Sequence, residues 1–100
     1  MSIKAEVVND SIFNIQIGER FDFSLVTEFR NVYEDLDPRV QQVDIDLSAT
    51  QYMDSSALGM LLNMQKILAE RHLTYRILNT RPQIARILQI SRFNKRFDIQ

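Results

Sequence analysis

The segment QYMDSSALGMLL, residues 51–62, places Asp54, Ser55 and Ser56 directly before a run of small and apolar residues. Aspartate and serine side chains accept hydrogen bonds from the free amides at a helix start, so Asp54 or Ser55 is expected to cap a helix here. Capping explains one of these residues and does not require three. Ser56 falls in the first turn, where its hydroxyl is accessible and the helix dipole favours an added anion. The residues alone leave two interpretations: a helix cap, or a serine presented to another protein's active site, where a phosphate would concentrate negative charge beside Asp54.

Catalysis by this chain is not expected. The single histidine, His72, ends the helix that Ser56 begins, so about four turns, or roughly 20 Å, separate a serine nucleophile from its base. No G-x-S-x-G motif and no glycine-rich phosphate loop occurs. Asp44 and Asp46 share one face of a predicted strand but lack a third ligand, so we expect exposed carboxylates rather than a metal site. No catalytic residue, metal or cofactor is predicted.

Composition indicates one globular domain, residues 1–100. Apolar residues make up 45% and charged residues 25% of the chain, and the absence of cysteine excludes disulfides and a thiolate nucleophile. The net charge of −1 is unevenly distributed, since residues 1–54 carry −7 and residues 55–100 carry +6. Such a split suggests two surfaces of opposite sign that can orient a partner, although a mixed, solvated surface explains it equally. No basic–aromatic pattern, signal peptide or membrane span appears, so we expect a cytoplasmic protein that binds neither nucleic acid nor membrane.

Two strands and one helix are predicted in the N-terminal part of the chain. Alternating apolar residues in 3–7 and 11–17, with Asn9-Asp10 between them, predict an antiparallel hairpin. From Asp22 the apolar period changes to three and four residues, which predicts a helix that stops at Asp37-Pro38.

The second half alternates strands with helices. Strands are predicted at 43–47, 73–78 and 96–99, and helices at 55–71 and 81–91, with Pro82 in the first turn of the latter. The order ββαβαβαβ predicts an α/β fold with a mixed sheet of four to five strands, parallel in its middle and covered by helices mainly on one face. The helix at 55–71 is apolar over a wide arc, which we expect to pack inside the protein rather than to remain exposed.

The segment DLSATQYMDSSALGMLL, residues 46–62, resembles the signature of the STAS domain family, in particular bacterial anti-sigma factor antagonists of the SpoIIAA type. The family order is an aspartate, a serine, the phosphorylated serine or threonine, a small residue and leucine. The matching residues here are Asp54, Ser55, Ser56, Ala57 and Leu58, followed by Gly59. Ala57 stands where glycine is commonest in the family.

A second family feature precedes the first helix. The Gly-Glu-Leu-Asp-like segment of the family reads Glu19-Arg20-Phe21-Asp22 here, with its glycine displaced to Gly18. The resemblance makes Asp22 the carboxylate that lies beside the phosphorylation site. These departures make the chain more similar to single-domain STAS regulators of proteobacteria, including the SypA-like proteins that govern biofilm formation.

The resemblance implies a phosphorylation-controlled switch. The unphosphorylated chain would bind a serine kinase that is also an anti-sigma factor, or a multidomain kinase–phosphatase regulator; phosphorylation of Ser56 would break the complex, and a PP2C-type phosphatase would restore it. The output would be transcription, biofilm formation or exopolysaccharide synthesis. The expected partner-binding residues surround the helix start: Asp22, Met53, Asp54, Ser55, Ala57, Leu58 and Met60. Of these, we expect Met53, Leu58 and Met60 to supply apolar contacts.

Two other functions remain open. A constitutive structural subunit of a transporter ATPase or of a stressosome-like assembly would dock through the same helix end. A ligand-binding STAS domain would need a cavity, of which the sequence gives no sign.

Overall fold

A five-stranded mixed sheet forms the centre of the protein in a computed structural model that describes residues 3–100. Its strands, in spatial order, are β1 (Ile3–Val8), β2 (Ile12–Ile17), β4 (Gln42–Asp46), β6 (Thr74–Leu78) and β7 (Asp98–Ile99). β1 and β2 form the predicted antiparallel hairpin, and Asn9 and Asp10 both adopt positive φ at its turn, as a tight hairpin requires. β2, β4, β6 and β7 pair in parallel, so the predicted α/β fold with a parallel centre is confirmed.

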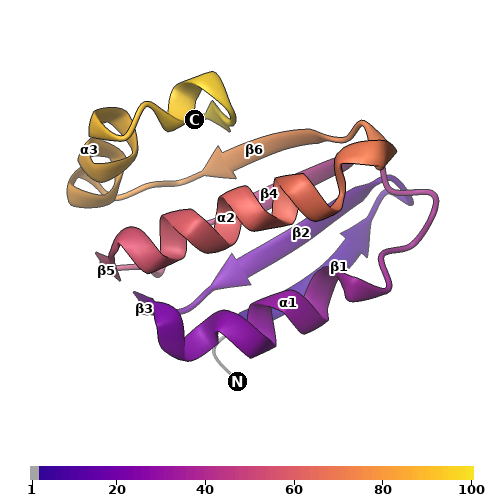
Figure 1. The fold of residues 1–100 in the computed structure, drawn as a ribbon, viewed down its shortest axis with the longest axis horizontal. Coiled ribbons are helices and arrows are strands. Elements are labelled where there is room, and N and C mark those ends of the chain that lie inside the picture. The colour runs from indigo at the N-terminus through magenta and orange to yellow at the C-terminus, as the bar shows by residue number, and fades with distance from the viewer. Residues whose placement is uncertain (1–2) are drawn as a thin grey trace.

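The helices cover one face of this sheet. They are α1 (Val26–Glu34), α2 (Ser55–Ile67) and α3 (Pro82–Ile90), with short 3-10 turns η1 (Phe23–Leu25), η2 (Ala69–Arg71) and η3 (Phe93–Lys95). α1 and α2 lie side by side across the sheet, while α3 lies at the end where β6 finishes (Figure 1). Pro82 occupies the first turn of α3 as predicted. No helix within residues 3–100 has the length and hydrophobicity that crossing a bilayer requires.

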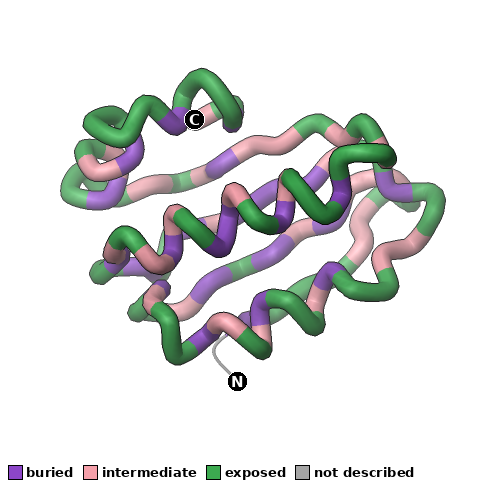
Figure 2. The backbone as a smooth tube through the Cα atoms, in the orientation of Figure 1, coloured by how far each residue is buried: buried purple, intermediate pink, exposed green. Residues whose placement is uncertain are grey.

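The core lies between the sheet and α1 and α2, where the purple segments of the two layers face one another (Figure 2). The wide apolar arc of α2 packs there as expected, because Leu61 and Met64 are fully buried. Phe29 of α1 contacts both Phe21 and Tyr33 through tilted and edge-on ring pairs. Ile67, at the end of α2, is the exception and remains 54% exposed.

The expectation that Asp44 and Asp46 are both exposed carboxylates is wrong for Asp44. Asp46 is partly exposed, but Asp44 is only 4% exposed. Arg76, its neighbour in register on β6, donates from Nε and Nη2 to the two Asp44 carboxylate oxygens at 2.9 and 2.7 Å, and Gln42 donates at 2.8 Å. Asp44 lies on the central strand, where side chains from both neighbouring strands cover it, so its burial depends on cross-strand pairing that its own segment does not reveal.

A second, two-stranded sheet was not predicted. It consists of β3 (Arg20–Phe21) and β5 (Tyr52–Met53), which pair in parallel beyond the ends of β2 and β4. The Thr50 side chain, which is fully buried, joins the two chain segments because its hydroxyl donates to the carbonyl oxygen of Gly18 at 2.8 Å. The amides of Gln51 and Tyr52 then donate to the carbonyl oxygen of Glu19. These bonds set the register of β3 against β5.

Replacing Thr50 by Val should therefore lower the free energy of unfolding by about 1–3 kcal/mol, because the Gly18 carbonyl loses its buried donor while the side-chain shape is kept. Denaturant unfolding of the wild type and the variant measures the change. Thr74→Val is the matched control, since the Thr74 hydroxyl is exposed and lies 3.5 Å from the Gln41 carbonyl oxygen. Equal losses for the two variants would contradict a specific role for Thr50.

Candidate functional site

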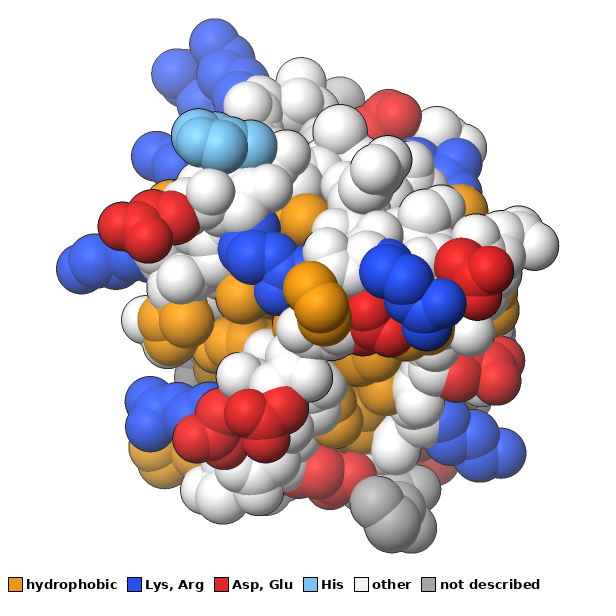
Figure 3. Space-filling model, turned by 90° about the vertical axis from the view of Figure 1, so that its right-hand side faces the viewer, with side chains coloured by type: hydrophobic (Ala, Val, Ile, Leu, Met, Phe, Trp, Pro, Cys, Tyr) orange, Lys and Arg blue, Asp and Glu red, His pale blue; other side chains and the backbone are white. Residues whose placement is uncertain are grey.

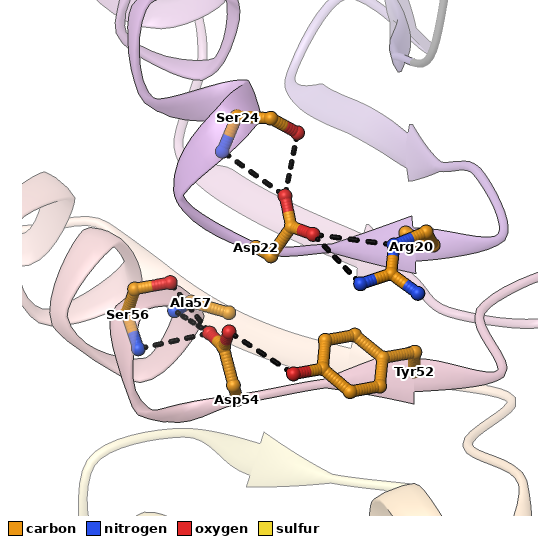
Figure 4. A network of polar contacts seen from close by, with 7 residues as sticks. All are labelled: Arg20, Asp22, Ser24, Tyr52, Asp54, Ser56 and Ala57. Carbon is orange, nitrogen blue, oxygen red and sulfur yellow. Dashed lines mark hydrogen bonds and ion pairs between the residues drawn. The ribbon is translucent and has the colours of Figure 1, made fainter.

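The β3–β5 pairing brings the two predicted carboxylates to one end of the molecule. Arg20 pairs with Tyr52 and Phe21 with Met53, so Asp22 and Asp54 follow at the next position of each parallel segment. Both aspartates have extended backbone and both cap the helical turn that follows. Figure 4 shows the two caps at matching ends of β3 and β5, each turned toward its own helical turn. The expectation that Asp22 lies near the start of α2 agrees with this geometry.

Asp54 is the N-cap of α2. Its Oδ1 accepts hydrogen bonds from the amides of Ser56 and Ala57 at 3.0 and 3.4 Å and from the Ser56 hydroxyl at 2.5 Å. The Tyr52 hydroxyl donates to Oδ2 at 3.4 Å. These donors, the Ser56 hydroxyl first among them, hold the pKa of the Asp54 carboxyl below its usual range. The Asp54 carboxylate is thus ionised at neutral pH and accepts hydrogen bonds from donors in the first turn of α2.

Asp22 repeats the arrangement at the other helix start. Its Oδ1 accepts from the amide and the hydroxyl of Ser24 at 3.0 and 2.5 Å, as Asp54 does from the serine two residues after it. Arg20 donates from Nε to Oδ2 at 3.2 Å. The Ser24 hydroxyl, followed by its amide, lowers the pKa of the Asp22 carboxyl. Two ionised carboxylates therefore lie beside each other at the surface.

Arg20, on β3, supplies a cation that contacts both Asp22 and Tyr52. Its guanidinium carbon is 4.2 Å from the centroid of the Tyr52 ring, and its Nη2 is 3.2 Å from Asp22. Tyr52 in turn contacts Asp54 through its hydroxyl. Figure 4 shows two groups of polar contacts, one around Asp22 and one around Asp54, and the stacking of Arg20 on Tyr52 joins them.

The predicted residues around the start of α2 differ in exposure. Ser55 is exposed, Ser56 and Leu58 are partly buried, and Ala57 is completely buried. Burial of Ala57 against the sheet explains why this position holds a small residue. Gly59 faces open space, with no atom near an added Cβ, so its small size is not required by packing within this chain.

Two side chains that were expected to supply apolar contacts to a partner are buried in the structure. Met53 and Met60 are 4% and 7% exposed, because Met53 alternates with Tyr52 on β5 and points inward, while Met60 lies on the core side of α2. Exposed apolar side chains on the segments that lead into the two caps include Phe23, 68% exposed, and Tyr52, 42% exposed. Phe23 lies outside the apolar stripe of α1, between Asp22 and Ser24, and that position was a usable signal in the sequence.

Other candidate chemistry lies away from this site. His72 is at the opposite end of the molecule, the end that Figure 3 shows, where acidic and basic side chains are intermixed. Within residues 3–100 no cluster of three or more potential ligands is placed to hold a metal ion. An open hollow of about 430 Å³, lined by Val40, Arg71 and His72 among others, also lies at that end. The site around Ser56 thus combines a hydroxyl, two carboxylates and a guanidinium at the surface.

Comparisons with known proteins agree on one family. The sequence profile of the STAS domain matches residues 4–100. A STAS-domain containing protein of Pseudomonas aeruginosa is 38% identical over 85 residues, which is 85% of this chain and 84% of that protein.

Solved structures share the fold. A putative anti-sigma factor antagonist from Thermotoga maritima superposes with a TM-score of 0.82 at 15% identity, covering 97% of this chain and 84% of that one. The phosphorylated form of the Bacillus cell fate determinant SpoIIAA gives a TM-score of 0.74 at 19% identity, covering 98% and 90% of the two chains. At these identities the likeness establishes the fold.

The cap geometry generates a prediction about stability. Ser56→Ala should change the free energy of unfolding by less than about 1 kcal/mol, because Asp54 keeps its two amide donors. Asp54→Ala should be more destabilising, since those amides lose their acceptor. Asp54→Asn keeps a side-chain oxygen that can cap the helix and removes the carboxyl group that titrates.

The pH dependence of the Asp54→Asn variant tests the same bond. The folded-state pKa of Asp54 lies below its ordinary value of 3.8, so its carboxylate stabilises the fold above about pH 4 and loses this effect as the pH falls through the folded-state pKa. The wild type should thus lose stability more steeply than Asp54→Asn below about pH 4, measured by urea unfolding between pH 2 and 7. Parallel curves would contradict this role of Asp54.

Proposed function

The chain belongs to the STAS domain family, and on that premise we propose that it is a phosphorylation-controlled partner switch of the anti-sigma factor antagonist type. The unphosphorylated chain binds a serine kinase that is also an anti-sigma factor, or a related multidomain regulator. Phosphorylation of Ser56 releases that partner, and a PP2C-type phosphatase resets the chain. Solved anti-sigma factor antagonists of the same fold support the general role.

The contact between the Ser56 hydroxyl and Asp54 carries the proposal. The hydroxyl donates its proton to a carboxylate that also caps α2. A phosphate on Oγ removes this donor and adds about −1.5 to −2 charges next to Asp54 and the neighbouring Asp22. The modified side chain must turn away from Asp54, while the two amide bonds can still hold the helix start. Phosphorylation thus alters the surface without requiring the domain to unfold.

The chemistry belongs to the partners. The kinase transfers the γ-phosphoryl group of ATP to Ser56 Oγ, the hydroxyl proton passes to a base of the kinase, and ADP leaves. The phosphatase uses water to cleave the new P–O bond, which returns the serine and inorganic phosphate. This chain is the substrate in both steps and needs no cofactor of its own. An ATP-dependent partner implies a cytoplasmic location, with transcription or biofilm formation as the output.

Ser55 and Ser56 are both candidate acceptors on grounds of access. Ser55 is the more exposed of the two. The family order supports Ser56, because it is the second residue after Asp54, and the direct hydroxyl–Asp54 contact links its modification to the cap. We therefore assign the phosphate to Ser56.

The proposed docking surface combines charge with exposed apolar area. Asp22, Asp54 and Ser55 supply polar contacts, and Phe23 and Tyr52 supply exposed rings beside them. Leu58 contributes its exposed part, whereas Met53, Ala57 and Met60 support the surface from below. Exposed aromatic rings next to charged groups are typical anchors of protein interfaces.

Binding to the regulator should depend on the state of Ser56. Ser56→Ala should keep the partner bound in the presence of kinase and ATP, and the phosphorylated wild type should release it. Ser56→Asp should weaken binding by less than phosphate does, because one carboxylate carries less charge and fewer acceptor oxygens. Calorimetry or a pull-down measures binding, with peptide-resolved mass spectrometry locating one phosphate on Ser56 and none on Ser55. Binding that is equally tight for all forms would support a constitutive structural subunit instead.

Phe23→Ser should weaken binding of the unphosphorylated chain by roughly tenfold or more if Phe23 is an interface anchor, since such residues contribute about 1–2 kcal/mol or more. Thermal stability should barely change, because Phe23 is exposed. Ile67→Ser is the control: Ile67 is also exposed but ends α2, far along the helix from Ser56. A loss of binding in Ile67→Ser without one in Phe23→Ser would place the interface elsewhere.

A further inference from the structure

Arg20 occupies an unusual position at the candidate site. It lies on β3 directly opposite Tyr52, and its side chain is 61% exposed, yet two contacts hold it in place. One is the ion pair with Asp22, and the other is the stacking of its guanidinium over the Tyr52 ring. The side chain therefore extends across the short sheet to the ring of Tyr52, whose hydroxyl contacts Asp54, the residue that accepts the Ser56 hydroxyl (Figure 4).

The contacts that hold Arg20 leave donors free. A guanidinium has five N–H donors, and Arg20 contacts Asp22 through Nε and Nη2. The pair with Asp22 is exposed and spans only two residues, so it is weak and exchangeable. Stacking on Tyr52 does not use the N–H groups, so it can persist while the guanidinium changes its anion. The stacking on Tyr52 thus holds Arg20 at the site, while its ion pair with Asp22 can be exchanged for another anion.

The charge of the surroundings gives Arg20 a second possible partner. Tyr52 connects it to Asp54, whose Oδ1 receives the Ser56 hydroxyl. A phosphate on Ser56 would enter a cluster that already holds two ionised carboxylates. Arginine binds phosphate through two parallel N–H bonds, and phosphate offers more charge and more acceptor oxygens than Asp22 does. Exchange of Asp22 for the phosphate is therefore favourable.

We propose that Arg20 is the intramolecular partner of the phosphate on Ser56, and that phosphorylation moves its guanidinium from Asp22 to the phosphate. This inference rests on the proposed phosphorylation of Ser56 and adds a regulatory residue to it. The modified surface then differs in two ways, because it gains a phosphate and frees the Asp22 carboxylate. Arg20 also neutralises part of the added charge, which allows the phosphorylated domain to stay folded.

The test uses protein in which phosphoserine is installed at position 56 by chemical ligation or by genetic encoding, so no kinase is needed. A ³¹P NMR titration measures the second pKa of the phosphate, which is about 6 for an exposed phosphoserine. A nearby guanidinium favours the dianion, so Arg20→Gln should raise this pKa by at least about 0.5 unit relative to the wild type. Arg20→Lys should give an intermediate value, because it keeps the charge and loses the planar fork.

Two matched variants make the test specific. Arg39→Gln breaks another exposed Arg–Asp pair of the same spacing, with Asp37, at the opposite end of the molecule and should not change the phosphate pKa. Arg81→Gln removes the cation at the start of α3, which lies against β5. The Nε–H signal of Arg20 should shift on phosphorylation. An unchanged pKa in Arg20→Gln, or an equal or larger rise in Arg81→Gln, would overturn the proposal.

These outcomes are independent of the proposed function. If phosphorylation releases the regulator but replacing Arg20 does not change the phosphate pKa, only the proposed role of Arg20 is wrong. If replacing Arg20 raises the phosphate pKa but phosphorylation does not affect binding of a regulator, the proposed partner switch is wrong and the proposed contact between Arg20 and the phosphate is supported.

Discussion

The hydrogen bond from the Thr50 hydroxyl to the Gly18 carbonyl oxygen aligns the two segments on which the candidate site is built. Parallel strands end at the same edge of a sheet, so the segments after β2 and β4 leave the core side by side. Parallelism alone does not fix their relative register. Thr50, fully buried, supplies that constraint, and the pairing of β3 with β5 follows from it. Every contact between the two helix starts depends on this alignment.

The aligned segments end in the same local structure. Asp22 and Asp54 each accept hydrogen bonds from the amide and the hydroxyl of the serine two residues later. Two ionised caps at neighbouring positions repel each other, and Arg20 offsets part of that repulsion from β3. The two carboxylates and Arg20 together therefore carry a net charge of about −1 before any modification. Under the proposed switch, a phosphate on Ser56 would add its charge to this small cluster, at the surface proposed to bind the partner.

Local patterns predicted much of the fold because each strand and helix carries its own periodicity. Alternation in 11–17 and the three-to-four period from Asp22 reflect one-sided burial, which any chain must encode along its own length. The short strands β3 and β5 have only two residues each and show no period. Burial of Asp44 was likewise hidden, because Arg76, 32 positions later, provides its partner.

The sequence by itself determined the longer strands and the helices, their order and the presence of a cap at Asp54 or Ser55, since an aspartate followed by serines is a local, short-range signal. It also carried the order of residues that resembles the STAS signature. Tertiary structure alone decided which side chains near the start of α2 are exposed: Met53 and Met60 are buried, whereas Phe23 and Tyr52 are exposed. It also brought Arg20 to Tyr52 and Asp22 to the neighbourhood of Asp54. These contacts join residues about 30 positions apart, and only the parallel register, fixed by buried hydrogen bonds, brings them together.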